Sequence, residues 1–202
     1  SMLSVWPGIC RMEGRVVKVG AGGTALDGRY NPAGFRAPQW RGYFATNQAL
    51  PTMQITRRLE FDAGHRIPNH QSQCRHLHGH RYALEVTLSG GVIDASDRPD
   101  DGMVMDFSEV KALAKRHVVD LWDHAFLVWR DDLAVVEFLS GIPDHKTVVL
   151  ERVPTAENLA RLAFAILDPL YRDSYGNLLR LERVRLYETP NCWADAYRAD
   201  KA

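Results

Sequence analysis

The sequence predicts an α+β fold, with a four-stranded antiparallel sheet and two helices on one of its faces. Strand-like alternation of apolar and polar residues occurs at residues 53–61, 78–88 and 179–189. Two segments with helical apolar spacing, near residues 106–121 and 155–168, lie between the second and the third of these strands. This order lacks the regular strand–helix alternation of a parallel sheet, which favours the α+β class.

The first two strands have the clearest pattern. Apolar residues alternate with polar ones from Met53 to Phe61. In the second strand one face is expected to carry every second residue from His78 to Leu88, which are His78, His80, Tyr82, Leu84, Val86 and Leu88. A glycine pair and the polar segment 97–102 are typical of turns, and residues 103–105 are predicted to form a short strand.

The first helix is expected to begin after Asp106, with Glu109 as the partner of that residue in a capping box. Its predicted buried face comprises Phe107, Val110, Leu113, Ala114, His117 and Leu121.

A long connection follows at residues 127–153 and includes a predicted strand at 147–150. Thr155 is the expected N-cap of the second helix. Because proline lacks an amide hydrogen, we expect that helix to end at Asp168-Pro169.

Residues 1–52 differ in composition from residues 53–202, which we expect to form the folded domain. The first segment holds eight of the 15 glycines, and its six basic and two acidic residues give it a charge of +4. Two interpretations stay open: the natural chain starts at Met53, or the segment is a loosely packed, poorly ordered extension. Val16–Val19 followed by Gly20 and Gly22 imitates a dinucleotide-binding turn, but no long helix follows, so a flexible loop is expected.

The overall composition narrows the class of protein. The chain has 25 basic and 25 acidic residues, whereas a nucleic-acid-binding protein of this size normally has a basic excess. No apolar run reaches the roughly 20 residues that span a bilayer, and no secretory signal precedes the domain. Three cysteines cannot build a disulfide framework. We therefore expect a cytoplasmic protein that binds neither nucleic acid nor membrane.

Five of the eight histidines lie between residues 65 and 80, and they predict a metal site. His78 and His80 share one face of a strand, and His65 on the preceding strand would supply a third imidazole. Catalytic zinc is typically held by three protein ligands, with a fourth position left for water or substrate. His70 and His76 compete for the role, but three successive histidines on one face would span too long a distance for one ion.

Other candidate residues allow more than one interpretation. Cys74 lies four residues before His78, where its thiolate could act as a base, or where it could be a small buried residue or a fourth, structural ligand. Asp123-His124 could relay protons or be a common surface dipeptide. Glu188, at the end of the last predicted strand, could be functional or a solvated edge residue.

Six motifs occur in an order that resembles one enzyme family. They are Phe61-Asp62-Ala63-Gly64-His65, the segment from Cys74 to His80, Met105-Asp106-Phe107, Asp123-His124, Pro154-Thr155-Ala156-Glu157-Asn158 and Tyr187-Glu188-Thr189. Together they resemble the 6-pyruvoyl-tetrahydropterin synthase and 6-carboxy-tetrahydropterin synthase family over about residues 53–198.

This resemblance implies the tunnelling fold, in which subunits join their sheets into a barrel and two trimers stack as a homohexamer. It implies that His65, His78 and His80 bind zinc and that Cys74 is the catalytic base. It further implies that Asp123 and His124 relay protons and that Glu188 anchors the pterin ring of 7,8-dihydroneopterin triphosphate.

The spacing Cys-x3-His-Gly-His resembles the 6-carboxy-tetrahydropterin synthases of queuosine biosynthesis, which release acetaldehyde and triphosphate. The alternative is a 6-pyruvoyl-tetrahydropterin synthase. The cysteine position disfavours it, because those enzymes usually place the cysteine two residues earlier. A zinc-dependent hydrolase and a non-catalytic, zinc-stabilised module are more distant alternatives. The long 127–153 connection departs from the compact members that this chain resembles, which leaves substrate access open.

Overall fold

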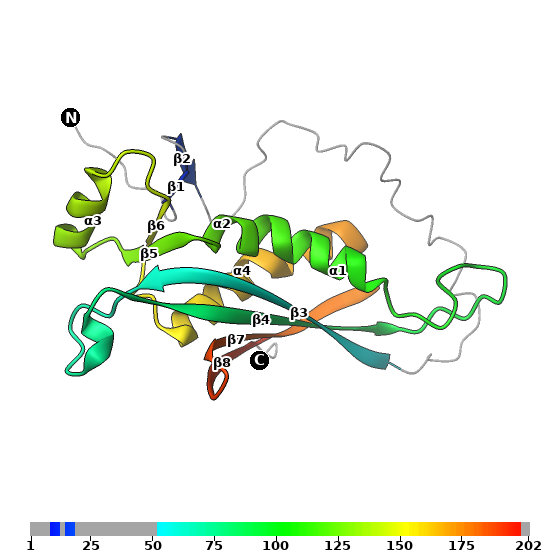
Figure 1. Cartoon of the computed structure of the whole chain (residues 1–202). Coiled ribbons are helices and arrows are strands. Elements are labelled where there is room, and N and C mark those ends of the chain that lie inside the picture. The colour runs from blue at the N-terminus through cyan, green and yellow to red at the C-terminus, as the bar shows by residue number, and fades with distance from the viewer. Residues whose placement is uncertain (1–8, 13–14, 19–51, 199–202) are drawn as a thin grey trace.

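The computed structural model describes residues 9–12, 15–18 and 52–198, and it contains one curled mixed sheet with helices packed against one face (Figure 1). The strands are β1 (Ile9–Met12), β2 (Arg15–Lys18), β3 (Thr52–His65), β4 (His78–Gly91), β5 (Ala125–Trp129), β6 (Thr147–Leu150), β7 (Leu179–Thr189) and β8 (Cys192–Tyr197). Their order across the sheet is β2-β1-β6-β5-β3-β4-β7-β8.

A four-stranded antiparallel unit is present as β3-β4-β7-β8, in which the sequence predicts β3, β4 and β7 but not β8. The long β3–β4 hairpin is in register from Thr52↔Gly91 to His65↔His78. Because paired residues of antiparallel strands point to the same face, this register places His65 beside His78 and Ala63 beside His80.

The sheet is larger and less uniform than predicted. β5 pairs in parallel with the end of β3 at Ala63–His65, and β6 pairs in parallel with β5, so the whole sheet is mixed. β1 joins β6 in antiparallel pairing and β2 joins β1. These two strands come from the segment expected to be a loop, while the rest of residues 1–51, including the glycines of the dinucleotide-like turn, lies outside the described residues.

The structure departs from the sequence prediction in three places, although the bounds of β7 agree with it. Residues 103–105 form no strand, although the backbone of Met103 still bonds to Ile93. The last predicted strand, β7, is followed by β8 after a tight turn. The 127–153 connection contains a further helix, α3 (Leu133–Ser140), besides the predicted strand β6.

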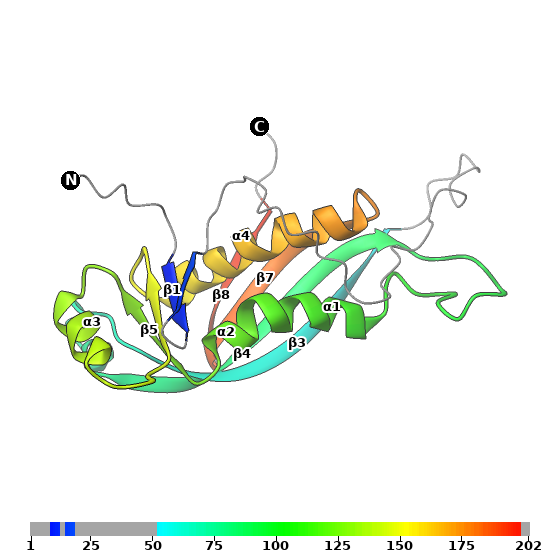
Figure 2. The same ribbon diagram turned by 90° about the horizontal axis from the view of Figure 1, so that it is seen from above.

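The helical segments are η2 (Gln73–Arg75), α1 (Phe107–Ala114), η3 (Lys115–Val119), α2 (Asp120–Trp122), α3 and α4 (Ala156–Tyr175). α1, η3 and α2 form one continuous helical stretch in which η3 is π-helical. This stretch and α4 cover the same face of the sheet and run side by side (Figures 1 and 2). None of the helices in the described ranges is long and apolar enough to span a membrane.

The helix caps agree only in part with the sequence pattern. Asp106 accepts a hydrogen bond from the Ser108 amide at 2.7 Å and caps α1 as expected. Glu109 forms no capping box, because its carboxylate accepts a hydrogen bond from the Tyr175 hydroxyl. Phe107 is exposed rather than buried.

α4 does not end at Pro169 but continues to Tyr175. Its buried residues on both sides of the proline include Leu167 and Tyr171, whose hydroxyl donates to the Val110 carbonyl at 2.7 Å. Packing of this face against the sheet and α1 therefore outweighs the hydrogen bond that the proline removes.

The hydrophobic core lies between the helices and the covered sheet face. On β4 that face carries Tyr82, Leu84, Val86 and Leu88, all fully buried. The same face continues beyond the apolar residues to His80 and His78, at the end of the sheet where β5 and the β3–β4 connection meet. The candidate site therefore lies at the edge of the core.

Candidate metal centre

Three histidines meet at this end of the covered sheet face. One possible ligand nitrogen of each of His65, His78 and His80 lies within 4.8 Å of the other two. The ring centroids are 4.5 Å apart for His65–His78, 5.2 Å for His65–His80 and 4.9 Å for His78–His80. The structure thus brings together the three residues that strand parity selects, since His78 and His80 share a face and His65 pairs with His78.

Backbone carbonyls orient two of these rings. The Nδ1 atom of His65 lies 2.8 Å from the carbonyl oxygen of Pro154, and the Nδ1 atom of His78 lies 2.8 Å from that of His76. Because a carbonyl oxygen only accepts, each Nδ1 must carry the hydrogen, which leaves the lone pair on Nε2. An imidazole held in this way by a second group is typical of a metal ligand.

Burial keeps His65 neutral. The ring is fully buried, and this burial is the main cause that lowers the pKa of His65 to about 4. The hydrogen bond to Pro154 opposes the shift, whereas His78 and His80 add to it. The pKa of His80 is also lowered, mainly by burial, although the charge of Glu188 opposes the effect. Neutral imidazoles are the form that binds a metal ion.

One atom of the trio has no partner. The Nε2 atom of His65 is buried and accepts no hydrogen bond from any described residue. A buried polar group without a partner is costly, so in a native protein it usually faces water, an ion or a ligand. Because the possible ligand atoms of His65, His78 and His80 lie within 4.8 Å of one another, a divalent cation held by the three imidazoles would satisfy this nitrogen. The donor set of three nitrogens fits zinc with one position left for another ligand.

Glu188 reaches the same centre from β7. Its Oε1 atom lies 3.4 Å from the Nε2 atom of His65, and the side chain is half-buried. The residue is therefore not the solvated edge residue that the sequence left open as an alternative. β8 lies beyond it in the sheet.

Cys74 and the two other nearby histidines stand apart from this group. Cys74 lies in η2, is half-buried and is not among the possible ligands that gather around His65. His70 accepts a hydrogen bond from the Ser72 amide through Nδ1, and the Nε2 atom of His76 faces the Arg75 guanidinium at 3.5 Å. Both rings are exposed and do not join the trio.

Asp123 and His124 lie at the opposite, uncovered face of β3. The Asp123 carboxylate accepts a hydrogen bond from the Asp62 amide at 3.0 Å and lies 3.0 Å from Nδ1 of His124. The His124 amide donates to the Asp62 carbonyl at 2.6 Å, and the residue has a positive φ of 56°. These contacts fix an acid–imidazole pair, and the hydrogen bonds to Asp123 lower its pKa against the opposing effect of burial.

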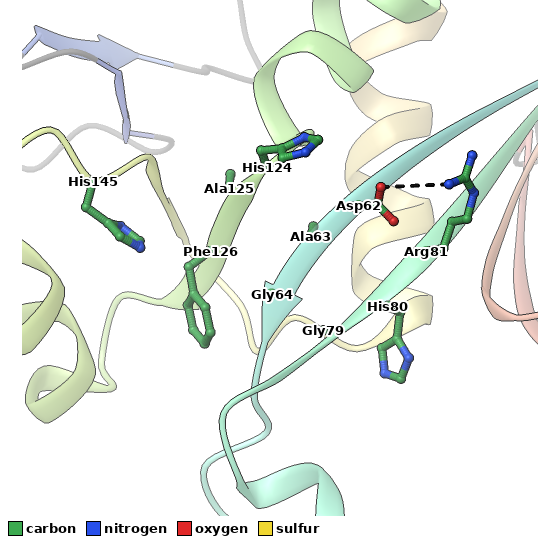
Figure 3. Close-up of a pocket in the computed structure, with 10 residues that line it drawn as sticks. All are labelled: Asp62, Ala63, Gly64, Gly79, His80, Arg81, His124, Ala125, Phe126 and His145. Carbon is green, nitrogen blue, oxygen red and sulfur yellow. Dashed lines mark ion pairs between the residues drawn. The ribbon is translucent and has the colours of Figure 1, made fainter.

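A cleft of about 500 Å³ opens beside this pair (Figure 3). Its lining residues are Asp62, Ala63, Gly64, Gly79, His80, Arg81, His124, Ala125, Phe126 and His145. His80 is among them, but its ring projects to the opposite side of β4 from Arg81, which is the side that the trio occupies (Figure 3). One chain therefore does not bring its acid–imidazole pair onto its own trio.

Asp62, Asp123 and His124 form a second group of possible ligands. Their exposure distinguishes them from the trio, since exposed acidic groups are common without a metal.

The structure adds residues that the sequence pattern did not single out. Pro154 holds His65 through its carbonyl, and His145 and Phe126 line the cleft. His145 is held at its Nδ1 atom by the Thr147 hydroxyl at 2.7 Å. These positions could be found from the sequence only by predicting the pairing of β5 with β6. That parallel pairing brings residues 124–126 beside residues 145–147.

Comparison with known proteins gives a consistent result. The profile of the family described as "6-pyruvoyl tetrahydropterin synthase" matches residues 54–199. A Rickettsia felis protein named 6-carboxy-5,6,7,8-tetrahydropterin synthase is 37% identical over 144 residues, which cover 71% of this chain and 99% of the relative. A Haemophilus influenzae protein of the same name is 30% identical and covers 70% of this chain and 96% of its own length. A Dictyostelium discoideum protein named 6-pyruvoyl tetrahydrobiopterin synthase is 29% identical, covering 69% and 92%.

Solved structures share the fold. The 6-pyruvoyl tetrahydropterin synthase of Caenorhabditis elegans matches with a TM-score of 0.51 and 25% identity, over 74% of this chain and 98% of that one. An uncharacterised protein of Wolinella succinogenes matches with a TM-score of 0.62 and 22% identity, over 74% and 99%.

Proposed function

This chain belongs to the 6-pyruvoyl tetrahydropterin synthase family, and on that premise we propose that it is a zinc-dependent lyase acting on 7,8-dihydroneopterin triphosphate. The proposed products are 6-carboxy-5,6,7,8-tetrahydropterin, acetaldehyde and triphosphate. The observation that carries the proposal is the trio His65, His78 and His80, in which the buried Nε2 atom of His65 has no hydrogen-bond partner among the described residues.

The 6-carboxy product is supported by two observations. Two relatives that bear the 6-carboxy name are 37% and 30% identical over 99% and 96% of their own length. The spacing from Cys74 to His78 is also the one that resembles the 6-carboxy enzymes.

The trio would hold zinc through three neutral nitrogens. When bound, zinc supplies Lewis acidity to the hydroxyl groups of the substrate side chain. Glu188, whose Oε1 atom lies 3.4 Å from Nε2 of His65, is the proposed acceptor of hydrogen bonds from the pterin ring. Cys74, from the connection between the two histidine-bearing strands, is the proposed base that removes a side-chain proton.

His124 is the proposed partner in proton transfer. The Asp123 carboxylate lies 3.0 Å from its Nδ1 atom and orients the ring. Because this pair lies on the other face of the sheet from the trio, the proposal places it in the active site of a neighbouring subunit. A homohexamer built from two trimers would provide such shared sites, and we propose that assembly.

The wider setting follows from the product. We propose that the enzyme works in the cytoplasm and serves queuosine biosynthesis, which uses a 6-carboxy-tetrahydropterin.

The alternative product is 6-pyruvoyl-tetrahydropterin, formed by triphosphate elimination without carbon–carbon cleavage. It is favoured by the Dictyostelium relative, which is 29% identical over 92% of its length.

Mass spectrometry of the products made by zinc-loaded protein from 7,8-dihydroneopterin triphosphate tests the proposal. We expect 6-carboxy-tetrahydropterin and an equal amount of acetaldehyde. A 6-pyruvoyl product without acetaldehyde would establish the alternative. Protein that binds zinc but leaves the substrate intact would contradict both and favour a zinc-stabilised module without catalytic activity.

A further inference from the structure

Two unpartnered polar atoms lie together at the metal centre. Among the described residues, four buried side-chain nitrogen or oxygen atoms have no hydrogen-bond partner, on Arg57, His65, Tyr82 and Arg183. A metal ion accounts for Nε2 of His65, but it does not account for the hydroxyl of Tyr82. A buried hydroxyl without a hydrogen-bond partner destabilises the folded protein. Its retention at this position therefore indicates a partner that forms only in the working protein.

The Tyr82 ring packs against two rings of the histidine trio. Tyr82 follows His80 by two residues on β4 and faces the same way. Its ring is fully buried, with its centroid 5.9 Å from that of His65 and 5.8 Å from that of His80. On the other side it stacks on Phe61 at 5.2 Å. A phenylalanine would fill the same space, so the hydroxyl is not needed for packing.

Glu188 is the neighbour of Tyr82 across the sheet. β4 and β7 pair up to Ala83↔Tyr187, and the next step of this register sets Tyr82 opposite Glu188. Side chains directly opposite in an antiparallel pair have Cβ atoms about 4.5–5.5 Å apart. The charge of Glu188 also contributes, after burial, to raising the pKa of Tyr82, as expected for near neighbours.

The position of Glu188 without metal is unfavourable. Its Oε1 atom lies 3.4 Å from Nε2 of His65, and Nε2 is an acceptor because Nδ1 donates to Pro154. Once a cation occupies Nε2, a carboxylate so close would be drawn onto the ion and would close the fourth position. An open position therefore requires another donor to hold Glu188.

We propose that in the metal-loaded protein the Tyr82 hydroxyl donates a hydrogen bond to the Glu188 carboxylate and keeps Glu188 from binding the metal. Tyr82 is then a positioning residue that preserves the open coordination site and orients Glu188 toward substrate. This inference rests on the metal site of the proposed function.

Cobalt binding to Tyr82→Phe protein tests the proposal without requiring turnover. With Glu188 released onto the ion, we expect Co²⁺ affinity, measured by competition with a chromogenic chelator, to rise about tenfold. Groups that hydrogen-bond to metal ligands change metal affinity on this scale. The visible spectrum of the cobalt protein should change, and inorganic azide, a probe of the open position, should bind more weakly. In a Glu188→Gln background the Tyr82→Phe substitution should change none of these quantities.

Tyr175→Phe is the matched control, because it removes another buried hydroxyl, bonded to Glu109 and distant from the trio. It should lower the thermal midpoint and leave cobalt affinity unchanged. Tyr82→Phe should leave the midpoint of the metal-free protein unchanged or raise it, which also verifies folding. Unchanged or weaker cobalt binding by folded Tyr82→Phe protein would overturn this inference but not the metal site. An equal rise in cobalt affinity when Tyr82→Phe is made in the Glu188→Gln background would have the same consequence. Wild-type protein that binds no cobalt would overturn the metal site and this inference together.

Discussion

The histidine trio combines side chains whose hydrogen bonds leave them ready to bind a cation. His65 and His78 donate from Nδ1 to the carbonyls of Pro154 and His76, so the lone pair of each ring is left on Nε2. The strand pattern predicts that His65, His78 and His80 share a face. It cannot predict the carbonyl of Pro154, because residues 65 and 154 are brought together only by tertiary packing.

Acid should destabilise the metal-free protein through His65. Burial lowers the pKa of His65 to about 4 from 6.5, so the unfolded chain takes up a proton on this residue before the folded one does. The contribution of neutral His65 is complete above pH 6.5 and is lost as the pH falls toward 4, by about 3 kcal/mol. His80 shifts in the same direction.

Denaturant unfolding of chelator-treated protein across this pH range measures the effect. The His65→Gln variant is the informative comparison, because it differs from the wild type in this residue alone. We expect a shallower loss of unfolding free energy in that variant. Equal slopes for the two proteins would contradict the assignment to His65.

Cys74 should be needed for turnover but not for metal binding. Because the sulfur is not among the grouped ligand atoms, Cys74→Ala should retain one zinc per chain and bind substrate, while turnover falls by at least about 10²-fold, the contribution of a general base. Zinc content by mass spectrometry and single-turnover kinetics check this. Loss of zinc in Cys74→Ala would instead support a structural, four-ligand site.

At the scale of elements, Gly64 near the end of β3 lets the Phe126 ring of β5 pack directly against the backbone of β3. A Cβ added at Gly64 would come within 2.6 Å of the Phe126 ring. Gly64→Ala should therefore destabilise the protein by about 1–3 kcal/mol, the usual cost of overpacking. Because Gly64 precedes His65, zinc affinity should fall as well.

Gly141→Ala is the matched control, since its nearest contact would be 3.4 Å from a backbone oxygen in a helical conformation. Thermal unfolding of the two variants, with and without Phe126→Ala, measures the clash. In a Phe126→Ala background the clash is absent, so we expect Gly64→Ala to lower the thermal midpoint much less there than in the wild type. A Gly64→Ala protein as stable as wild type would refute the close packing.

Elements with strong periodicity are those the sequence predicts well. β3, β4 and β7 alternate clearly, and the N-cap Thr155 accepts a hydrogen bond from the Asn158 amide at 3.3 Å as the pattern suggests. In β5 apolar and polar residues do not alternate, because both sheet faces are covered there and the consecutive residues Leu127 and Val128 are both buried. The sequence pattern therefore does not distinguish β5 from a connection. α4 crosses Pro169 because tertiary packing outweighs local propensity.

At the scale of the whole molecule, the two chemical groups lie on different faces of one sheet. The trio belongs to the covered face and the Asp123–His124 pair to the uncovered one, and β3 has no partner on its outer edge before Ala63 among the described strands. Sequence motifs alone cannot establish this separation, because it depends on which face of the sheet each side chain points to.

Shared active sites predict complementation between two inactive variants. Cys74→Ala and His124→Ala proteins should each be inactive, and random co-assembly in equal amounts should give both intact groups in roughly one site in four. Activity after co-refolding measures this fraction, and native mass spectrometry verifies subunit exchange. A mixed oligomer no more active than its parents would place all the groups within one chain.

The central claim is a metal centre of three histidine nitrogens with a fourth position open to substrate. Anomalous diffraction at the zinc edge from crystals of the zinc-loaded protein tests it most directly. We predict one strong site per chain, at about 2.0–2.1 Å from nitrogens of His65, His78 and His80. Zinc bound instead by Asp62, Asp123 and His124, or zinc closed off by the Cys74 sulfur as a fourth ligand, would contradict the account.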